Sequence, residues 1–140
     1  GSCLTGPLHR GAELHGFLSY LIKASKEKRK YYIFGYKGKQ VRDNIHSEDV
    51  VQACWEFYKT KNNSGAYNIG GGRSNSCSIL EAIDILQKKH DIETKYQILK
   101  KNRSGDHIWY ISDNSKFQDK HKNWKIKRNL NSIISEIVAN

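Results

Sequence analysis

Residues 31–50 have the sequence YYIFGYKGKQVRDNIHSEDV and carry the signals for a strand, a glycine-containing loop and the start of a helix. Residues 31–34 are aromatic or β-branched, which predicts a short strand that ends at Gly35. We expect residues 35–43 to form a loop. Ser47 is a favourable N-cap, and acidic residues follow it, so a helix is predicted to begin there. The apolar side chains that we expect this helix to bury are Val50, Val51, Cys54, Trp55 and Tyr58.

Short strands and amphipathic helices alternate on both sides of this segment. Apolar residues recur at i, i+3, i+4, i+7 and i+8 in residues 11–24 and again in residues 130–138, which predicts a helix in each. Ser78 and Glu81 have the spacing of a capping box before another helix. The alternation predicts an α/β fold with short strands and about four helices. Three further strands are predicted at residues 66–69, 95–99 and 107–111. The apolar helix positions are Leu14, Phe17, Leu18, Leu21 and Ile22, then Ile79, Leu80, Ile83 and Leu86, then Leu130, Ile133, Ile134, Ile137 and Val138.

The composition favours a single intracellular domain with reduced cysteines. A chain of 140 residues with 37% hydrophobic residues suits a single domain over residues 1–140. It has no apolar run of about 18 residues, so no membrane segment is expected. Its three cysteines are widely spaced and form no CxxC pair, which predicts free thiols, no zinc site and a cytoplasmic location.

The formal net charge of +10 has two interpretations. Lysines and arginines spread over loops and helix ends form a solvated surface that keeps a small protein in solution. A basic nucleic-acid-binding module, or a non-catalytic interaction module, remains the alternative, although the sequence contains no zinc knuckle, RNP-type sequence or KH loop. A small diphosphate ligand would need only two or three well-placed arginines.

Three segments contain candidate anion ligands, and each has a structural alternative. Residues 70–73, GGGR, lie between a predicted strand and a capped helix, where they could hold a phosphate or form a tight turn. Arg42 could bind phosphate or pair with an acidic neighbour. Residues 102–107, NRSGDH, could bind an anion or form a polar turn. None of the six histidines shows HxH or HExxH spacing, so we expect no metal ligands.

Four motifs in order resemble the C-terminal part of extended short-chain dehydrogenase/reductase enzymes, the NAD-dependent epimerases and dehydratases of nucleotide sugars. The motifs are CLTGP at 3–7, GYKGKQVRDNIH at 35–46, YNIGGG at 67–72 and RSGD at 103–106. The segments 13–18, 45–47 and 106–113 are most similar to the CDP-paratose/CDP-tyvelose 2-epimerase branch.

The resemblance implies a binding site for a CDP- or UDP-linked sugar. Arg42 and Arg103 would hold the diphosphate from two sides, and Asp106 would bond a ribose hydroxyl or fix its loop. The resemblance further places Tyr32 and Phe34 along the base pocket, and Cys3 and Leu4 near the sugar and the nicotinamide edge.

The resemblance also implies NAD in the full-length enzyme, bound by an N-terminal Rossmann half. This chain has neither that half's glycine fingerprint nor a Tyr-x-x-x-Lys pair in a Rossmann setting. We therefore expect no catalytic residue and no cofactor in this chain alone, and no turnover by it. Without that half, two apolar faces should lose part of their cover and be covered by self-association or by the N-terminal half; they are formed by Val50, Val51, Cys54 and Trp55 and by Ile79, Ile83 and Leu86.

Overall fold

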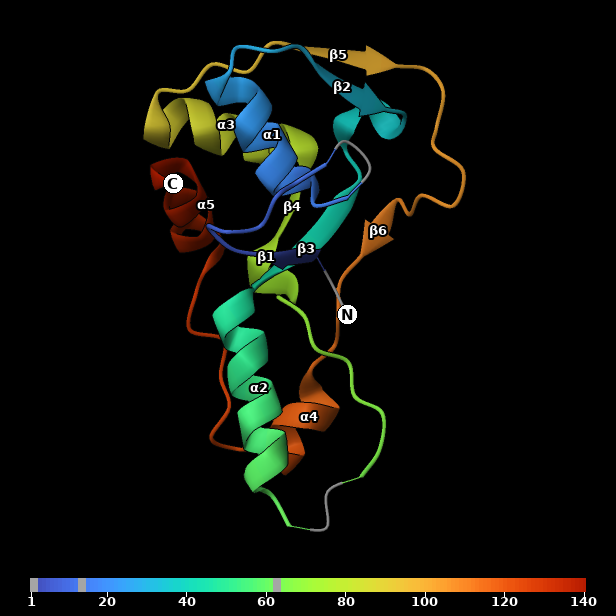
Figure 1. Ribbon diagram of the computed structural model, residues 1–140. Helices are drawn as coiled ribbons and strands as arrows, with labels where there is room; N and C mark the ends of the chain where they lie inside the picture. The colour runs from blue at the N-terminus through green and yellow to red at the C-terminus, as the bar shows by residue number, and fades with distance from the viewer. Residues whose placement is uncertain (1–2, 13–14, 62–63) are drawn as a thin grey trace.

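The computed structural model describes residues 3–12, 15–61 and 64–140 as a mixed α/β fold (Figure 1). Helices α1, α3 and α5 gather at one end of the molecule, and α2 and α4 lie at the other. Strand β3 lies between the two groups. The helices are α1 (Phe17–Lys26), α2 (Ser47–Lys59), α3 (Ile79–His90), α4 (Ser115–Lys120) and α5 (Leu130–Ala139), and the strands are β1 (Cys3–Thr5), β2 (Tyr31–Phe34), β3 (Val41–His46), β4 (Ser76–Ser78), β5 (Tyr96–Leu99) and β6 (Trp109–Tyr110).

Strand β3 organises the main sheet. Its first half pairs with β4 in the antiparallel direction and with β6 in the parallel direction, and its second half pairs with β1 in parallel. A separate pair of parallel strands joins β2 to β5, with Tyr31 opposite Tyr96. The expectation of a loop through residue 43 is therefore wrong from Val41 onward. Three consecutive polar residues, Arg42, Asp43 and Asn44, conceal the strand because both of its faces carry polar side chains.

The larger hydrophobic core lies among α1, α3, α5 and β2. The apolar spacing of the first, third and last predicted helices is confirmed, since Leu18, Leu21, Leu86, Ile133 and Ile134 are fully buried. Helix α1 begins later than residue 11, after Gly16, which has a left-handed backbone at φ 68°. Leu14, which we expected on this helix, lies outside the described residues.

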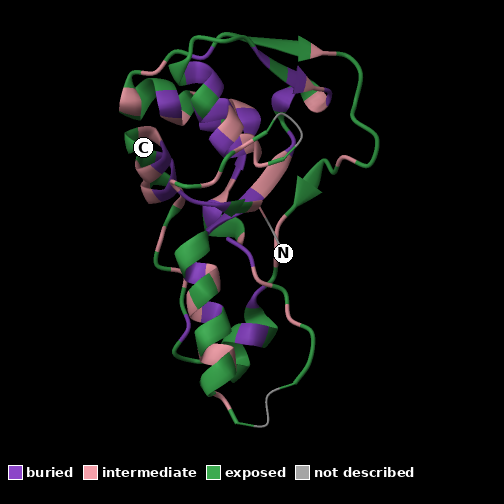
Figure 2. Cartoon of the chain, viewed as in Figure 1, coloured by how far each residue is buried: buried purple, intermediate pink, exposed green. Residues whose placement is uncertain are grey.

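A smaller core joins β3 to α2 and α4. Ile45, Ala53, Phe117 and Trp124 are buried there. The predicted burial along α2 is wrong for most of its residues, because α4 and Trp124 cover only one side of the helix. Val51, Trp55 and Tyr58 are 61%, 52% and 77% exposed, and the outward side of α2 is exposed in Figure 2.

Three local predictions need correction. The described chain has no strand at residues 66–69; Tyr67 and Ile69 instead pack against the smaller core. The N-cap of α2 is His46, whose Nδ1 accepts from Glu48 N at 3.1 Å, and Ser47 is the first helical residue. The described chain has five α-helices rather than about four, because the six-residue α4 is too short to show a helical apolar period.

Two of the three predicted strands are confirmed in shortened form, as β5 and β6. The capping box before α3 is confirmed, with Ser78 and Glu81 bonded reciprocally. Within the described ranges, no helix has the length and apolar character needed to cross a membrane.

Candidate functional site

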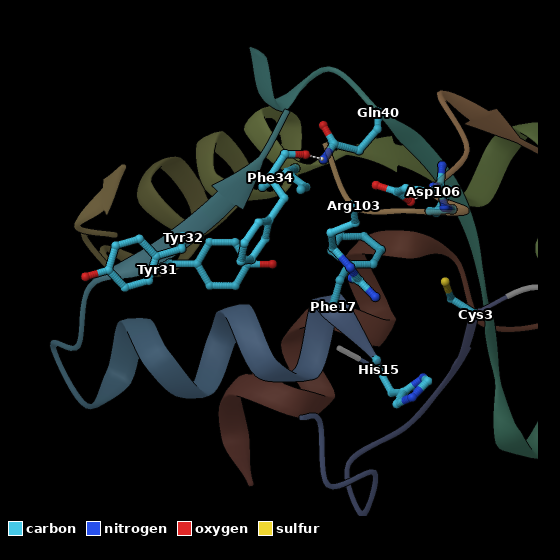
Figure 3. Close-up of a pocket in the computed structure, with 12 residues that line it drawn as sticks. Cys3, His15, Phe17, Tyr31, Tyr32, Phe34, Gln40, Arg103 and Asp106 are labelled. Carbon is cyan, nitrogen blue, oxygen red and sulfur yellow. Dashed lines mark hydrogen bonds and ion pairs between the residues drawn. The ribbon is translucent and has the colours of Figure 1, made fainter. Parts of the chain in front are cut away.

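A cavity of about 250 Å³ opens between the start of α1, strands β2 and β3, and the loop from β5 to β6 (Figure 3). The cavity brings together six of the seven residues that the sequence indicated for ligand binding. Its lining residues are Cys3, His15, Gly16, Phe17, Tyr31, Tyr32, Phe34, Gln40, Arg42, Ile79, Arg103 and Asp106.

Strand β3 supplies Arg42, and its guanidinium is fixed in two directions. Arg42 Nη1 donates to the main-chain oxygen of Val41 at 2.7 Å, and Nη2 lies 2.5 Å from Asp106 Oδ1. The side chains of Arg42 and Asp106 are only 16% and 18% exposed. Of the two structural alternatives for Arg42, the pairing with a carboxylate is present, but the partner is Asp106 of a distant loop rather than the adjacent Asp43.

Arg103 comes from the loop between β5 and β6. The main-chain N–H of Asp106 bonds to the carbonyl of Arg103 at 3.3 Å, and Gly105 takes a left-handed backbone at φ 73° in this turn. The far end of the loop is tied to β3, because Val41 N donates to Ile108 O at 2.9 Å and β6 continues the sheet. In Figure 3 the Arg103 side chain extends into the middle of the cavity, toward Phe17. Arg42 and Arg103 therefore line one cavity from separate segments.

Aromatic side chains form the opposite wall. Tyr31, Tyr32 and Phe34 come from β2, and Phe17 begins α1 (Figure 3). Tyr31 is almost wholly buried, whereas Tyr32 is 42% exposed. Flat, apolar rings next to a cationic centre suit a ligand that has both an aromatic and an anionic part.

Strand β1 places its two predicted ligand residues differently. Cys3 lines the cavity, and burial raises the pKa of its thiol, while the nearby Arg42 acts in the opposite direction. Leu4 is absent from the cavity wall and is 46% exposed, beside a separate hollow that includes Pro7 and His46. Successive strand residues face opposite sides of a sheet, so Cys3 and Leu4 cannot both face the cavity.

The glycines of residues 70–73 serve close packing. A Cβ on Gly71 would lie 2.0 Å from Asn44 O, and one on Gly70 would lie 2.3 Å from Ser112 Oγ. Gly72 N donates to Asp43 Oδ2 at 2.9 Å. The tight turn is thus the interpretation that the structure supports, since the chain here lies against β3 rather than around a ligand-sized space.

The sequence did not reveal the buried polar residues Asp43 and Asn44, which hold in place the strand that carries Arg42. Asp43 is fully buried, and its Oδ2 accepts from the main-chain N–H groups of Gly72 and Ser112. Asn44 is also fully buried, and its Nδ2 donates to Arg42 O at 3.2 Å. Adjacent polar residues within a short strand are the sequence signal for such a support, because a buried strand keeps polar side chains only where they are bonded.

The histidines form no metal site in the part of the chain that the structure describes, where no three His, Cys, Asp or Glu side chains gather in a ligand set. His46 has a structural position: besides capping α2, its Nε2 lies 3.0 Å from Glu136 Oε2 on α5. His15 lines the cavity, whereas His121 packs against Phe117 at 4.2 Å between ring centroids.

Known structures share this fold over nearly the whole chain. MoeE5 in complex with UDP-glucuronic acid and NAD superimposes with a TM-score of 0.85 and 22% identity, covering 99% of this chain and 44% of that one. The UDP-glucuronic acid 4-epimerase of Bacillus cereus, in complex with UDP-glucuronic acid and NAD, gives a TM-score of 0.83 and 26% identity over 99% of this chain and 42% of that one. The fold is therefore that of a part of an extended short-chain dehydrogenase/reductase.

Sequence comparisons indicate which members of this class the chain resembles. Residues 2–70 match the family described as "NAD dependent epimerase/dehydratase family". The chain is also 32% identical over 78 residues to the CDP-paratose 2-epimerase of Salmonella typhi, an alignment covering 54% of this chain and 23% of that protein. The chain thus spans less than half the length of each of these relatives.

Proposed function

We propose that this chain binds the nucleotide-diphosphate part of a sugar nucleotide, as a portion of an NAD-dependent nucleotide-sugar epimerase. The observation that carries the proposal is the convergence of Arg42 and Arg103, from separate segments, on one cavity with an aromatic wall. Each guanidinium can donate paired hydrogen bonds to charged phosphate oxygens, so the two together suit a diphosphate.

In this proposal, each part of the ligand has its own neighbours in the cavity. Arg42 and Arg103 hold the diphosphate, and Tyr32 and Phe34 lie beside the base. Cys3, at the β1 side of the cavity, borders the sugar. Leu4 has no contact with this cavity and takes no part in the proposal.

The proposed ligand is a CDP-linked sugar. The support is the 32% identity to the CDP-paratose 2-epimerase of Salmonella typhi. The structural relatives named above contain UDP-glucuronic acid, and UDP is therefore the comparison that the experiment has to include.

The described residues of this chain do not fit a site for NAD. The glycine run packs against Asn44 and Asp43, which leaves no cradle for a pyrophosphate. The only Tyr-x-x-x-Lys spacing in the sequence runs from Tyr96 to Lys100, along and just beyond β5. Residues four apart in a strand are about 13 Å apart, too far to act as one catalytic pair. We infer that hydride transfer requires residues outside this chain and that the chain alone does not convert a CDP-sugar.

Calorimetric titration of the chain with CDP, UDP and a short single-stranded oligonucleotide tests the proposal. We expect CDP to bind, and Arg42→Ala and Arg103→Ala each to weaken CDP binding by roughly tenfold or more, the scale of one charge-assisted hydrogen bond. Arg73→Ala is the matched control, because Arg73 is an exposed arginine away from the cavity. Absence of CDP and UDP binding, or binding of the oligonucleotide in preference to both, would overturn the proposal. Preference for UDP would overturn only the assignment of the base.

A further inference from the structure

The cavity contains a carboxylate where a diphosphate would be expected to meet only cations. Asp106 lies on the same cavity wall as Arg42 and Arg103, and its Oδ1 is 2.5 Å from Arg42 Nη2. The same oxygen accepts from the main-chain N–H of His107 at 3.0 Å, which holds the carboxylate in place. Asp106 is therefore the fixed counter-ion of Arg42.

This pairing sets a condition on any anion that enters. The Arg42 guanidinium already has one carboxylate and one carbonyl as acceptors. A phosphate group must replace Asp106 as the partner of Arg42, or it must bind Arg42 while the Asp106 carboxylate stays a few ångströms away. Because both side chains are mostly buried, that repulsion is weakly screened by solvent.

Bare phosphates and nucleotide esters meet this condition differently. Pyrophosphate at neutral pH presents mostly acceptor oxygens, and it carries more negative charge than a diphosphate diester because its terminal phosphates can lose a further proton. A nucleotide sugar is a diphosphate diester without those extra charges, and it brings hydroxyl donors that can replace Arg42 as the partner of Asp106. The carboxylate therefore disfavours the bare anion more strongly than the ester.

We propose that Asp106, as the counter-ion of Arg42, is a specificity-determining residue that makes this cavity select nucleotide-diphosphate esters over inorganic phosphates. This inference rests on the proposed function, and it assigns to Asp106 the exclusion of abundant small anions. Arg103, which lines the cavity from the loop between β5 and β6, then attracts the diphosphate, while Arg42 is available only to a ligand that satisfies Asp106.

The test measures the dissociation constants of pyrophosphate and of CDP-glucose for the wild-type chain and for Asp106→Asn. The asparagine keeps the shape of the side chain but removes its charge. We expect pyrophosphate to bind about tenfold more tightly to Asp106→Asn, the scale of one charge-assisted contact, with a smaller gain or a loss for CDP-glucose. Asp113→Asn is the matched control, since Asp113 is an exposed carboxylate outside the cavity.

A second background tests whether Asp106 acts through Arg42. In an Arg42→Ala background, Asp106→Asn should have a smaller effect on pyrophosphate, because no guanidinium is left to be released and only the repulsion by the carboxylate is removed. Equal shifts for both ligands, weaker pyrophosphate binding by Asp106→Asn, or the same effect in both backgrounds would overturn the inference while leaving the proposed function intact. Failure of the wild-type chain to bind any nucleotide would overturn both.

Discussion

Asp43 Oδ2 accepts the main-chain N–H of Gly72 at 2.9 Å, which ties the glycine run to the strand that carries Arg42. The same oxygen accepts Ser112 N at 3.0 Å, and the Asp43 side chain is fully buried. One carboxylate thus joins β3 to two segments that are distant in sequence. Of these two adjacent residues, Arg42 therefore lines the cavity, whereas Asp43 holds the surrounding segments together.

Replacing Asp43 should destabilise the whole fold. Asp43→Ala leaves two partly buried N–H groups without this acceptor and removes a buried carboxylate, which we expect to cost roughly 3 kcal/mol of unfolding free energy. Urea denaturation followed by circular dichroism measures the loss. Asp119→Ala is the control, because Asp119 is exposed and pairs with Lys122 on the surface, and its effect should stay within about 0.5 kcal/mol. If Asp43→Ala were as stable as the wild type, the hydrogen bonds of Asp43 would not stabilise the fold.

The outward face of α2 should mediate self-association of the isolated chain. Trp55 and Tyr58 stack with ring centroids 5.5 Å apart and are both more than half exposed, and Val51 is one turn away. Association is favoured when it removes exposed apolar groups of this kind from water. Sedimentation velocity or light scattering over a range of concentrations should detect dimers or larger species, and Val51→Glu combined with Trp55→Glu should shift the chain to monomer.

The exposed Ile98 of β5 supplies the control for this prediction. Ile98→Glu also places a charge on an exposed apolar position, but β5 and α2 lie at opposite ends of the molecule (Figure 1). It should leave the association unchanged. A wild-type chain that remains monomeric at every concentration would rule out this face as a self-association surface.

The capping box of α3 should make stability depend on pH in the acid range. Glu81 Oε2 accepts the main-chain N–H of Ser78 at 2.7 Å, and this hydrogen bond lowers the pKa of Glu81 below its ordinary value. A lowered pKa in the folded state means that the stabilisation is complete above the ordinary glutamate pKa of 4.5 and is lost as the pH falls through the lowered value.

Thermal melts between pH 7 and pH 3 of the wild type and of Glu81→Gln measure this contribution. The difference in Tm between the two proteins should narrow as the medium becomes more acidic. Ser78→Ala removes the other half of the box and should cost about 1 kcal/mol at neutral pH, as loss of an N-cap usually does. A pH-independent difference between wild type and Glu81→Gln would exclude the ionised Glu81 as the stabilising form.

The helices of the larger core were predictable from sequence, whereas β3 and the face of α2 were not. The helical spacing of Leu18, Leu21 and Ile22 indicates that one side of the helix is buried, and this indication does not depend on which element the helix packs against. Val51 and Trp55 also have helical spacing. Whether they are buried depends on which side of α2 is covered by α4 and Trp124, and this is set by tertiary packing that the local sequence does not show. In β3, the alternation that marks a strand is hidden because Asp43 and Asn44 are buried by hydrogen bonding rather than by hydrophobicity.

The candidate site was only partly accessible from sequence. The motifs indicated Arg42 and Arg103, and the structure places both along one cavity, yet their roles there stay predictions. The partner of Arg42 could not be inferred, because the contact with Asp106 depends on how the loop after β5 returns to β3. Leu4 was grouped with Cys3 because the two are adjacent in the motif, although adjacent residues of a strand face opposite sides.

The three cysteines should differ sharply in reactivity toward a thiol reagent such as DTNB. Burial raises the pKa of Cys77 to about 12 and raises that of Cys3 as well, whereas Cys54 is exposed on α2. Since the thiolate is the reactive form, Cys77 is almost entirely protonated and inert at pH 8. The native chain should therefore show one fast thiol, Cys54→Ser should remove that phase, and unfolding in urea should expose all three cysteines. If Cys77 reacted as fast as Cys54 in the native chain, strand β4 could not be packed against β3 as the hydrogen bond from Asn44 Nδ2 to Cys77 Sγ requires.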